Sequence, residues 1–220
     1  MPKVLVEELN LQNIANSIRS KNGSSNTYTP AEMSTAIAEL PSGGEDLSNY
    51  FETTMTSGTT SSSGVNKIIK KIPNTIEITG NSALCLFYRC NNLIEIPLFN
   101  TNNVTNMRNM CYECSSITNL PEYNTSNVTD FYSMCYGCTN LVNVPVLNAS
   151  KATLMTYMFS SCPNLSNDSL NNILMMCTTA TSYTGNKKLS TIGLTSAQAQ
   201  ICTTLSNYQA FLDAGWITGY

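Results

Sequence analysis

The sequence has 220 residues, a formal net charge of −3 and no histidine, and only 11% of its residues are charged. A chain of this length has room for one or two domains with a sizeable apolar core. Its weakly acidic composition gives no electrostatic basis for binding nucleic acid, and no apolar run approaches the roughly 18 residues of a membrane span, so we expect neither a nucleic-acid partner nor membrane insertion.

Residues 1–41 predict a small helical hairpin module. A first helix carries apolar residues at helical spacing and ends at Gly23. Pro30, preceded by a threonine cap, opens a second helix. The apolar positions of the two helices include Ile14, Ile18, Met33 and Ile37.

The order of residues in this hairpin, "IANSIRSKNGSSNTYTPAEM", is similar to a module near the N-terminus of tail-associated and accessory proteins of bacteriophages that infect Gram-positive bacteria. This resemblance implies that residues 1–41 attach the chain to a virion through Ile14, Ile18, Met33 and Ile37. An ordinary helical hairpin without that role is the alternative interpretation.

Residues 42–65 are rich in glycine, serine and threonine, which is typical of a flexible linker. A neighbouring subunit could instead order this segment, or it could pair as an irregular first strand. All three interpretations stay open from the sequence.

The chain from residue 66 onward repeats its chemistry every 24 residues. A period of this size is typical of a solenoid, in which each turn buries its apolar face against its neighbours. Three columns show the repeat: Cys90, Cys114, Cys138 and Cys162; Leu86, Met110, Met134 and Met158; and Pro97, Pro121 and Pro145.

Each repeat predicts a helix followed by a short strand. Apolar residues between Val104 and Cys114 recur at intervals of three and four, which favours a helix. The segment Leu93–Ile96 and its copies are short and β-branched and stop at a proline, which favours brief strands in a parallel ladder. A column of asparagines follows the proline and predicts either an amide ladder or simply a turn: Asn100, Asn124 and Asn148.

The segments "NVTNMRNMCYECSSITNLPEYNTSNVTDFYSMCYGCTNL" and "LMTYMFSSCPNL" resemble the BspA-like class of leucine-rich repeats, which occurs in bacterial surface proteins and in bacteriophage structural proteins. The resemblance implies an α/β solenoid, a short leucine-rich-repeat array with one helix and one short parallel strand per turn, preceded by the helical hairpin. This chain departs from the usual pattern where a proline shortens the strand.

The two ends of the array predict capping segments. Ile69, Ile72 and Pro73 lie one period before their counterparts and indicate a degenerate first turn. We therefore place the solenoid at residues 66–220, with a helical cap at 169–220. In that cap we expect a helix capped by Asp168, a last strand at 187–194, a helix opened by Thr195 or Ser196, a helix from Tyr208 to the Gly215 stop, and Trp216 sealing the end.

The cysteines do not predict catalysis or a metal. Cys111 and Cys114, repeated one period later, match the spacing of a zinc site, but Phe87 and Phe159 occupy the column of Cys111 in flanking turns. A position that accepts phenylalanine is a packing position, so we expect buried thiols. The number of cysteines is odd and we find no signal peptide at the start, which predicts reduced thiols in a protein made in a cytoplasm. The absence of histidine excludes a Cys–His pair. We expect no enzyme activity and no cofactor.

One column could bind a partner: Tyr88, Tyr112 and Tyr136. Each tyrosine follows a core position by one residue, so the three predict a partly exposed row suited to sugar or protein contacts. The alternative is that the rings cover the seam between adjacent helices.

Together these features favour a non-enzymatic bacteriophage virion structural protein, a tail, fibre or other accessory component. Its expected partners are other virion proteins and a host cell-surface polysaccharide or protein. It is expected to form a homo-oligomer and to reside in the virion after synthesis in the host cytoplasm. The alternative is a bacterial cell-surface adhesin with the same repeats.

Overall fold

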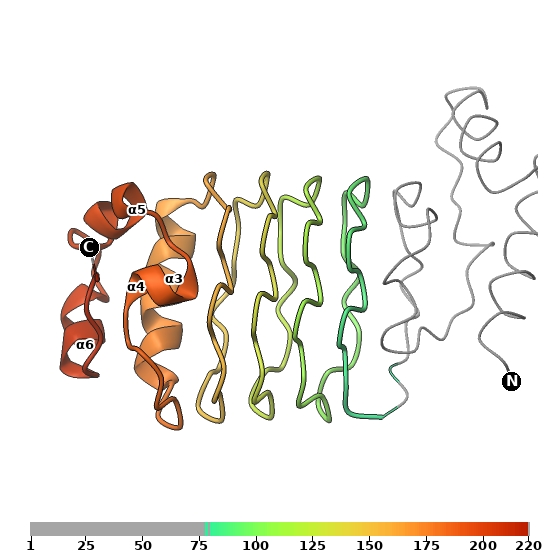
Figure 1. The fold of residues 1–220 in the computed structure, drawn as a ribbon, viewed down its shortest axis with the longest axis horizontal. Coiled ribbons are helices and arrows are strands. Elements are labelled where there is room, and N and C mark those ends of the chain that lie inside the picture. Colours follow the sequence, from blue (N-terminus) through green and yellow to red (C-terminus); the bar gives the residue numbers. More distant parts are fainter. Residues whose placement is uncertain (1–77, 79, 220) are drawn as a thin grey trace, which may run out of the picture.

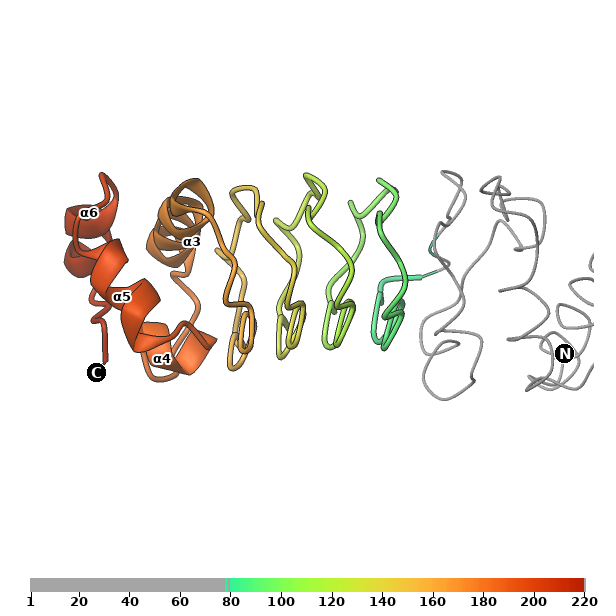
Figure 2. The ribbon, with the colours of Figure 1, turned by 90° about the horizontal axis from the view of Figure 1, so that it is seen from above.

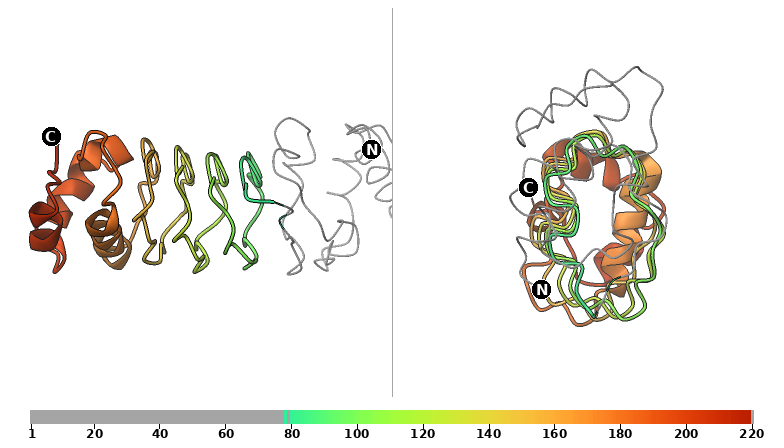
Figure 3. Two further views of the ribbon diagram at one scale, coloured as in Figure 1. Left: turned by 90° about the horizontal axis from the view of Figure 1, so that it is seen from below. Right: turned by 90° about the vertical axis from the view of Figure 1, so that its right-hand side faces the viewer.

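The computed structural model of the chain describes residues 78 and 80–219. Its main feature is a series of turns that return to the same place after each 24-residue period, joined by isolated parallel bridges. Figure 1 shows these turns side by side in chain order, with helices beyond the last of them. Viewed down the row in Figure 3, the turns overlie one another around a common outline. The bridged residues are Ser82, Asn106, Asp130 and Leu154.

We number the turns from these residues: turn 1 is 82–105, turn 2 is 106–129, turn 3 is 130–153 and turn 4 is 154–166. Each turn has a curled arc at its start, which contains the repeated cysteine. Turns 1 to 3 each continue into an extended segment that contains the proline.

In the curled arc, backbone N–H groups point alternately to the next turn and back along their own turn. In turn 2, the N–H of Cys111 donates to the Met134 carbonyl at 2.8 Å, and the N–H of Cys114 donates to the Cys111 carbonyl at 3.1 Å. An α-helix would use all of these donors internally. The helix expected in each turn is therefore replaced, over the residues that the structure describes, by a run of tight turns that buries apolar residues at a similar spacing.

The tight turns place two positions per arc at positive φ. In turn 2 these are Asn109, with φ 54°, and Glu113, with φ 56°. The same two columns have positive φ in the other three arcs, where the second column contains Gly137, with φ 73°. A positive φ at the third residue is typical of type II turns, which favour glycine there.

The extended segments bury every third residue instead of alternating like a strand. Turn 1 buries Leu93, Ile96 and Phe99, and the corresponding residues of turns 2 and 3 are buried as well. A period of three is that of a polyproline II helix, which fits the proline in each copy. Among the described residues only one bridge joins two of these segments, between Asn119 and Asn143. The short parallel strand expected in each turn is thus reduced to this bridge.

The asparagine column has a turn function. The Oδ1 atoms of Asn100, Asn124 and Asn148 each accept the backbone N–H two residues further on, at 3.0, 3.2 and 2.9 Å. Of the two predicted functions, the turn is therefore observed in all three copies. One member of the column also bonds an amide of the preceding turn: Asn124 Nδ2 donates to Asn102 Oδ1 at 2.8 Å. A second amide-to-amide bond between turns lies in another column, where Asn143 Nδ2 donates to Asn119 Oδ1 at 2.6 Å.

Four helices follow the turns and cover the end of the core (Figure 2). The helix α3 is capped by Ser166, which accepts the Ser169 N–H, and not by Asp168 as expected. The helix α5 has the expected Thr195 cap, completed by Gln198 as a capping box. The helices are α3 (Asn167–Thr179), α4 (Leu189–Ile192), α5 (Ser196–Cys202) and α6 (Tyr208–Asp213).

The last strand expected at 187–194 is wrong, because α4 occupies the middle half of it. The strand pattern there reduces to one parallel bridge between Lys188 and Ile217. Trp216 has 1% of its surface exposed and stacks on Tyr183 with ring centroids 5.4 Å apart, as its expected sealing role requires. The hairpin at 1–41, the linker at 42–65 and the degenerate first turn lie outside the described residues.

Gly137 tests the positive-φ column. A β carbon there would lie 3.1 Å from Cγ of Glu113. The new residue would also have to keep the left-handed backbone conformation of Gly137. We expect Gly137→Ala to lower the free energy of unfolding by about 1 kcal/mol. Ser161 lies in the same column, exposed, with φ 60°. Ser161→Gly should therefore be neutral or stabilising. Urea melts of both variants measure the contrast, and equal destabilisation would contradict the assigned backbone.

Candidate binding surface

The structure brings Tyr88, Tyr112 and Tyr136 together as one stacked column, which we call the tyrosine ladder. The ring centroids of Tyr88 and Tyr112 lie 4.9 Å apart, and the two ring planes are inclined by 14°. For Tyr112 and Tyr136 the centroid distance is 4.8 Å and the angle between the ring planes is 5°. All three side chains are half-buried. The ladder follows from the backbone: each tyrosine occupies the same place in the curled arc of successive turns.

Stacking determines what the ladder can offer a ligand. Both faces of the Tyr112 ring are covered by its neighbours, so this residue presents its edge and its hydroxyl group. A sugar that stacks on an aromatic ring needs a free face, which the centre of the ladder does not provide. The rings also cover the seam between turns, so the two predicted functions of this column are compatible.

Charges beside the ladder are paired. Arg89 Nε lies 2.9 Å from Oε2 of Glu113, and the Arg89 guanidinium lies 5.3 Å from the centroid of the Tyr88 ring. Partial burial, followed by the negative charge of Glu113, raises the pKa of Tyr112. The tyrosine hydroxyl therefore stays protonated near neutral pH.

A second aromatic cluster lies in turns 2 to 4 and was not anticipated from the sequence. Arg108 Nε lies 2.8 Å from Oδ2 of Asp130, and its guanidinium lies 4.5 Å from the centroid of Tyr132. Tyr157, with 48% of its surface exposed, meets the Tyr132 ring edge-on at 6.0 Å. The column of Arg108 and Tyr132 changes residue type in every turn, so periodicity gave no signal there.

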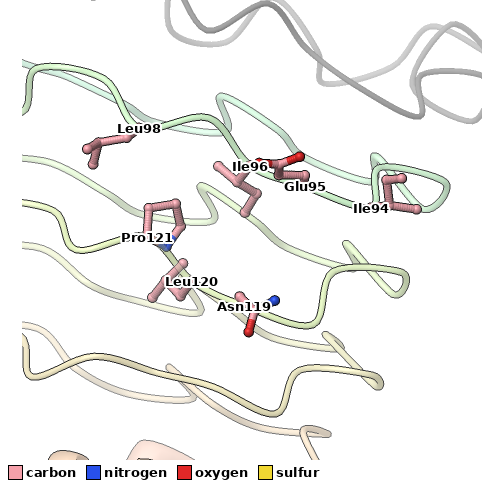
Figure 4. Close-up of a pocket in the computed structure, with 7 residues that line it drawn as sticks. All are labelled: Ile94, Glu95, Ile96, Leu98, Asn119, Leu120 and Pro121. Atoms are coloured by element: carbon pink, nitrogen blue, oxygen red, sulfur yellow. The ribbon is translucent and has the colours of Figure 1, made fainter. Parts of the chain in front are cut away.

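A shallow groove of about 400 Å³ opens where the extended segments of turns 1 and 2 meet (Figure 4). Ile94 and Leu98 stand at its rim with 58% and 62% of their surfaces exposed. The sequence held one signal for it: these residues occupy columns that turn 2 fills with polar residues, Thr118 and Glu122. We call this feature the turn 1–2 groove; it is lined by Ile94, Glu95, Ile96, Leu98, Asn119, Leu120 and Pro121.

The repeated cysteines form a column of buried hydrogen-bond donors. Three of these thiols donate to a backbone carbonyl of the preceding turn, among them Cys114 to Phe87 at 3.0 Å and Cys138 to Cys111 at 3.1 Å. Cys162 makes the same contact. Burial raises the pKa of the Cys138 thiol, so it keeps the proton that it donates. Within the part of the chain that the structure describes, no group of three His, Cys, Asp or Glu side chains is arranged to hold a metal ion.

The four proposed attachment residues, Ile14, Ile18, Met33 and Ile37, lie outside the described residues. Over residues 78 and 80–219, no helix is long and apolar enough to cross a membrane.

The ladder predicts a graded loss of stability. Tyr112→Ala removes two stacked pairs and should lower the free energy of unfolding by about 1–3 kcal/mol beyond its lost burial. Tyr136→Ala removes one recorded ring pair and should cost less. Tyr112→Phe keeps the ring and serves as the control. Thermal melts followed by circular dichroism measure the order; a Tyr112→Phe variant as unstable as Tyr112→Ala would point to the hydroxyl instead of the stack.

The cysteine column predicts a packing effect without metal. Cys114→Ala and Cys138→Ala should each lower the free energy of unfolding by about 1 kcal/mol or more, because each removes a buried sulfur and its hydrogen bond. A chelator should leave the melting temperature of the wild-type protein unchanged. A zinc site would behave oppositely, since its binding energy contributes to folding. Stoichiometric zinc by elemental analysis, with a melting temperature that falls on chelation, would overturn the packing interpretation.

A family model covers the turns and part of the cap, at residues 45–190. That range is more than half of the chain. Neither a curated protein nor a solved structure matches the sequence. The chain therefore belongs to the family described as "Mycoplasma protein of unknown function, DUF285".

Proposed function

We propose that the protein is a non-enzymatic structural component of a bacteriophage virion. In this proposal its repeat domain, an array of 24-residue turns of the leucine-rich-repeat kind, contacts other virion proteins or the host surface. The observation that supports a non-enzymatic function is the tyrosine ladder, whose neighbouring charges are paired. Glu113 and Asp130, the carboxylates nearest the aromatic rows, are both held in ion pairs with arginines. Such an arrangement supports recognition by a fixed surface better than proton transfer, which needs a carboxylate free to change its charge.

The virion assignment has a separate source. It rests on the resemblance of residues 1–41 to the phage module and of the repeats to the BspA-like class. In this proposal residues 1–41 bind the particle and the repeat domain projects from it. A homo-oligomer joined through the N-terminal segment would present several copies of the repeat surface.

A second candidate function is that of a bacterial cell-surface adhesin. The family description names Mycoplasma, a bacterium, and this favours a cellular protein over a viral one. The two candidates differ in where the protein is found. Mass spectrometry and immunogold imaging of purified particles and of host cells would separate them: particle-bound protein at a fixed copy number supports the virion assignment, and protein found on cells without particles supports the adhesin.

Truncation tests the division of labour within the chain. We expect a protein without residues 1–41 to be folded and soluble, because the described core begins well after that point, yet to be missing from particles. Circular dichroism checks the fold, light scattering of the full-length and shortened chains reports the oligomeric state, and mass spectrometry of particles reports incorporation. Normal incorporation of the shortened chain would place attachment elsewhere.

A further inference from the structure

At the turn 1–2 groove, one backbone hydrogen bond that joins the extended segments of turns 2 and 3 has no counterpart between turns 1 and 2. Between turns 2 and 3, the N–H of Leu120 donates to the Asn143 carbonyl at 2.9 Å. The equivalent N–H in turn 3, that of Val144, donates to Oγ of Ser169 at 2.7 Å. In turn 1 the equivalent donor is the N–H of Ile96, which has no hydrogen-bond partner among the described residues.

The matching acceptor is also left open. The Asn119 carbonyl, one period before that of Asn143, accepts no hydrogen bond from the described part of the chain. The groove is lined by the residues that carry this donor and this acceptor (Figure 4). Backbone groups left without partners readily pair with an added peptide, as at the edge of a sheet.

The side chains around the opening specify what else a ligand must carry. Ile94 and Leu98 offer exposed apolar surface at the rim, and Ile96 and Leu120 form a nearly buried floor, 3% and 5% exposed. Glu95 is exposed and makes no ion pair with another described residue, in contrast to Glu113. Both the apolar rim and the unpaired negative charge are therefore unmatched within the described structure.

We propose that the turn 1–2 groove binds an extended peptide segment of a partner protein. A backbone carbonyl of this segment accepts a hydrogen bond from the Ile96 N–H. An apolar side chain of the partner covers Ile94 and Leu98, and an adjacent lysine or arginine pairs with Glu95. This site is separate from the tyrosine ladder, and the inference stands whether or not the protein is part of a virion.

A selection experiment tests this proposal. A library of random heptapeptides displayed on yeast cells is selected for binding to the immobilised full-length chain. We expect the selected sequences to combine an aliphatic residue with a lysine or arginine. Calorimetry with the synthesised peptide should show that Leu98→Ser raises the Kd by about ten-fold or more, since it removes the contact area of a leucine. Glu95→Gln should raise the Kd by about two- to five-fold, as expected for an exposed ion pair.

The repeat supplies matched controls. Val146 lies in the column of Leu98 two turns further on, is 51% exposed and is not part of the groove, so Val146→Ser should leave the Kd unchanged. Asp213→Asn, at an exposed carboxylate of α6 away from the groove, is the control for the charge. All four side chains are exposed, so the variants should keep the wild-type melt. In amide NMR spectra the peptide should shift the Ile96 signal. The proposal fails if no peptide is selected, if the selected peptides are acidic, if Leu98→Ser binds as well as Val146→Ser, or if the Ile96 amide does not move.

Discussion

The rest of the structure depends on one hydrogen-bond register, in which alternate backbone N–H groups of an arc donate to carbonyls 23 residues further along the chain, as Met107 does to Asp130 and Phe131 does to Leu154. A fixed register between turns forces each position to meet the same position of the next turn. An insertion of one residue within a turn would displace every column that follows it. The 24-residue period of the sequence is therefore a requirement of the backbone, and the constancy of the buried columns follows from it.

The same register decides how polar groups are satisfied inside the stack. The buried Thr101 hydroxyl donates to the Asn124 carbonyl at 2.9 Å, and the buried Tyr123 hydroxyl donates to the Pro97 carbonyl at 2.8 Å. The cysteine thiols reach carbonyls of the preceding turn in the same manner. These side chains supply donors to carbonyls that the backbone of each turn leaves unpaired inside an apolar core, and an unpaired buried carbonyl would cost about 1–3 kcal/mol. The need to satisfy these carbonyls explains why a cysteine, and not merely any small apolar residue, occupies the column.

The sequence was sufficient to predict the columns, their burial and most of the C-terminal helices, because periodicity and capping residues such as Thr195 act locally. It was not sufficient to predict the backbone of each turn. Apolar residues three and four apart fit a helix, but they fit consecutive tight turns equally well, and only the bonds to the next turn distinguish the two. The turn 1–2 groove was beyond prediction for a related reason: it depends on hydrogen bonds that Leu120 makes and Ile96 does not, while both residues are aliphatic and buried.

Regular and irregular parts of a repeat array favour different kinds of recognition. The tyrosine ladder repeats with the register, so its rings satisfy one another and leave edges that are alike from turn to turn. Such a surface distinguishes poorly between neighbouring positions along the stack. The turn 1–2 groove occurs where one hydrogen bond between the extended segments of turns 1 and 2 is missing, and there the donor, the acceptor, the apolar rim and the charge of Glu95 coincide only once among the described turns. Because specificity requires features that are not repeated, a partner that must bind in one place is recognised better at this break than on the ladder.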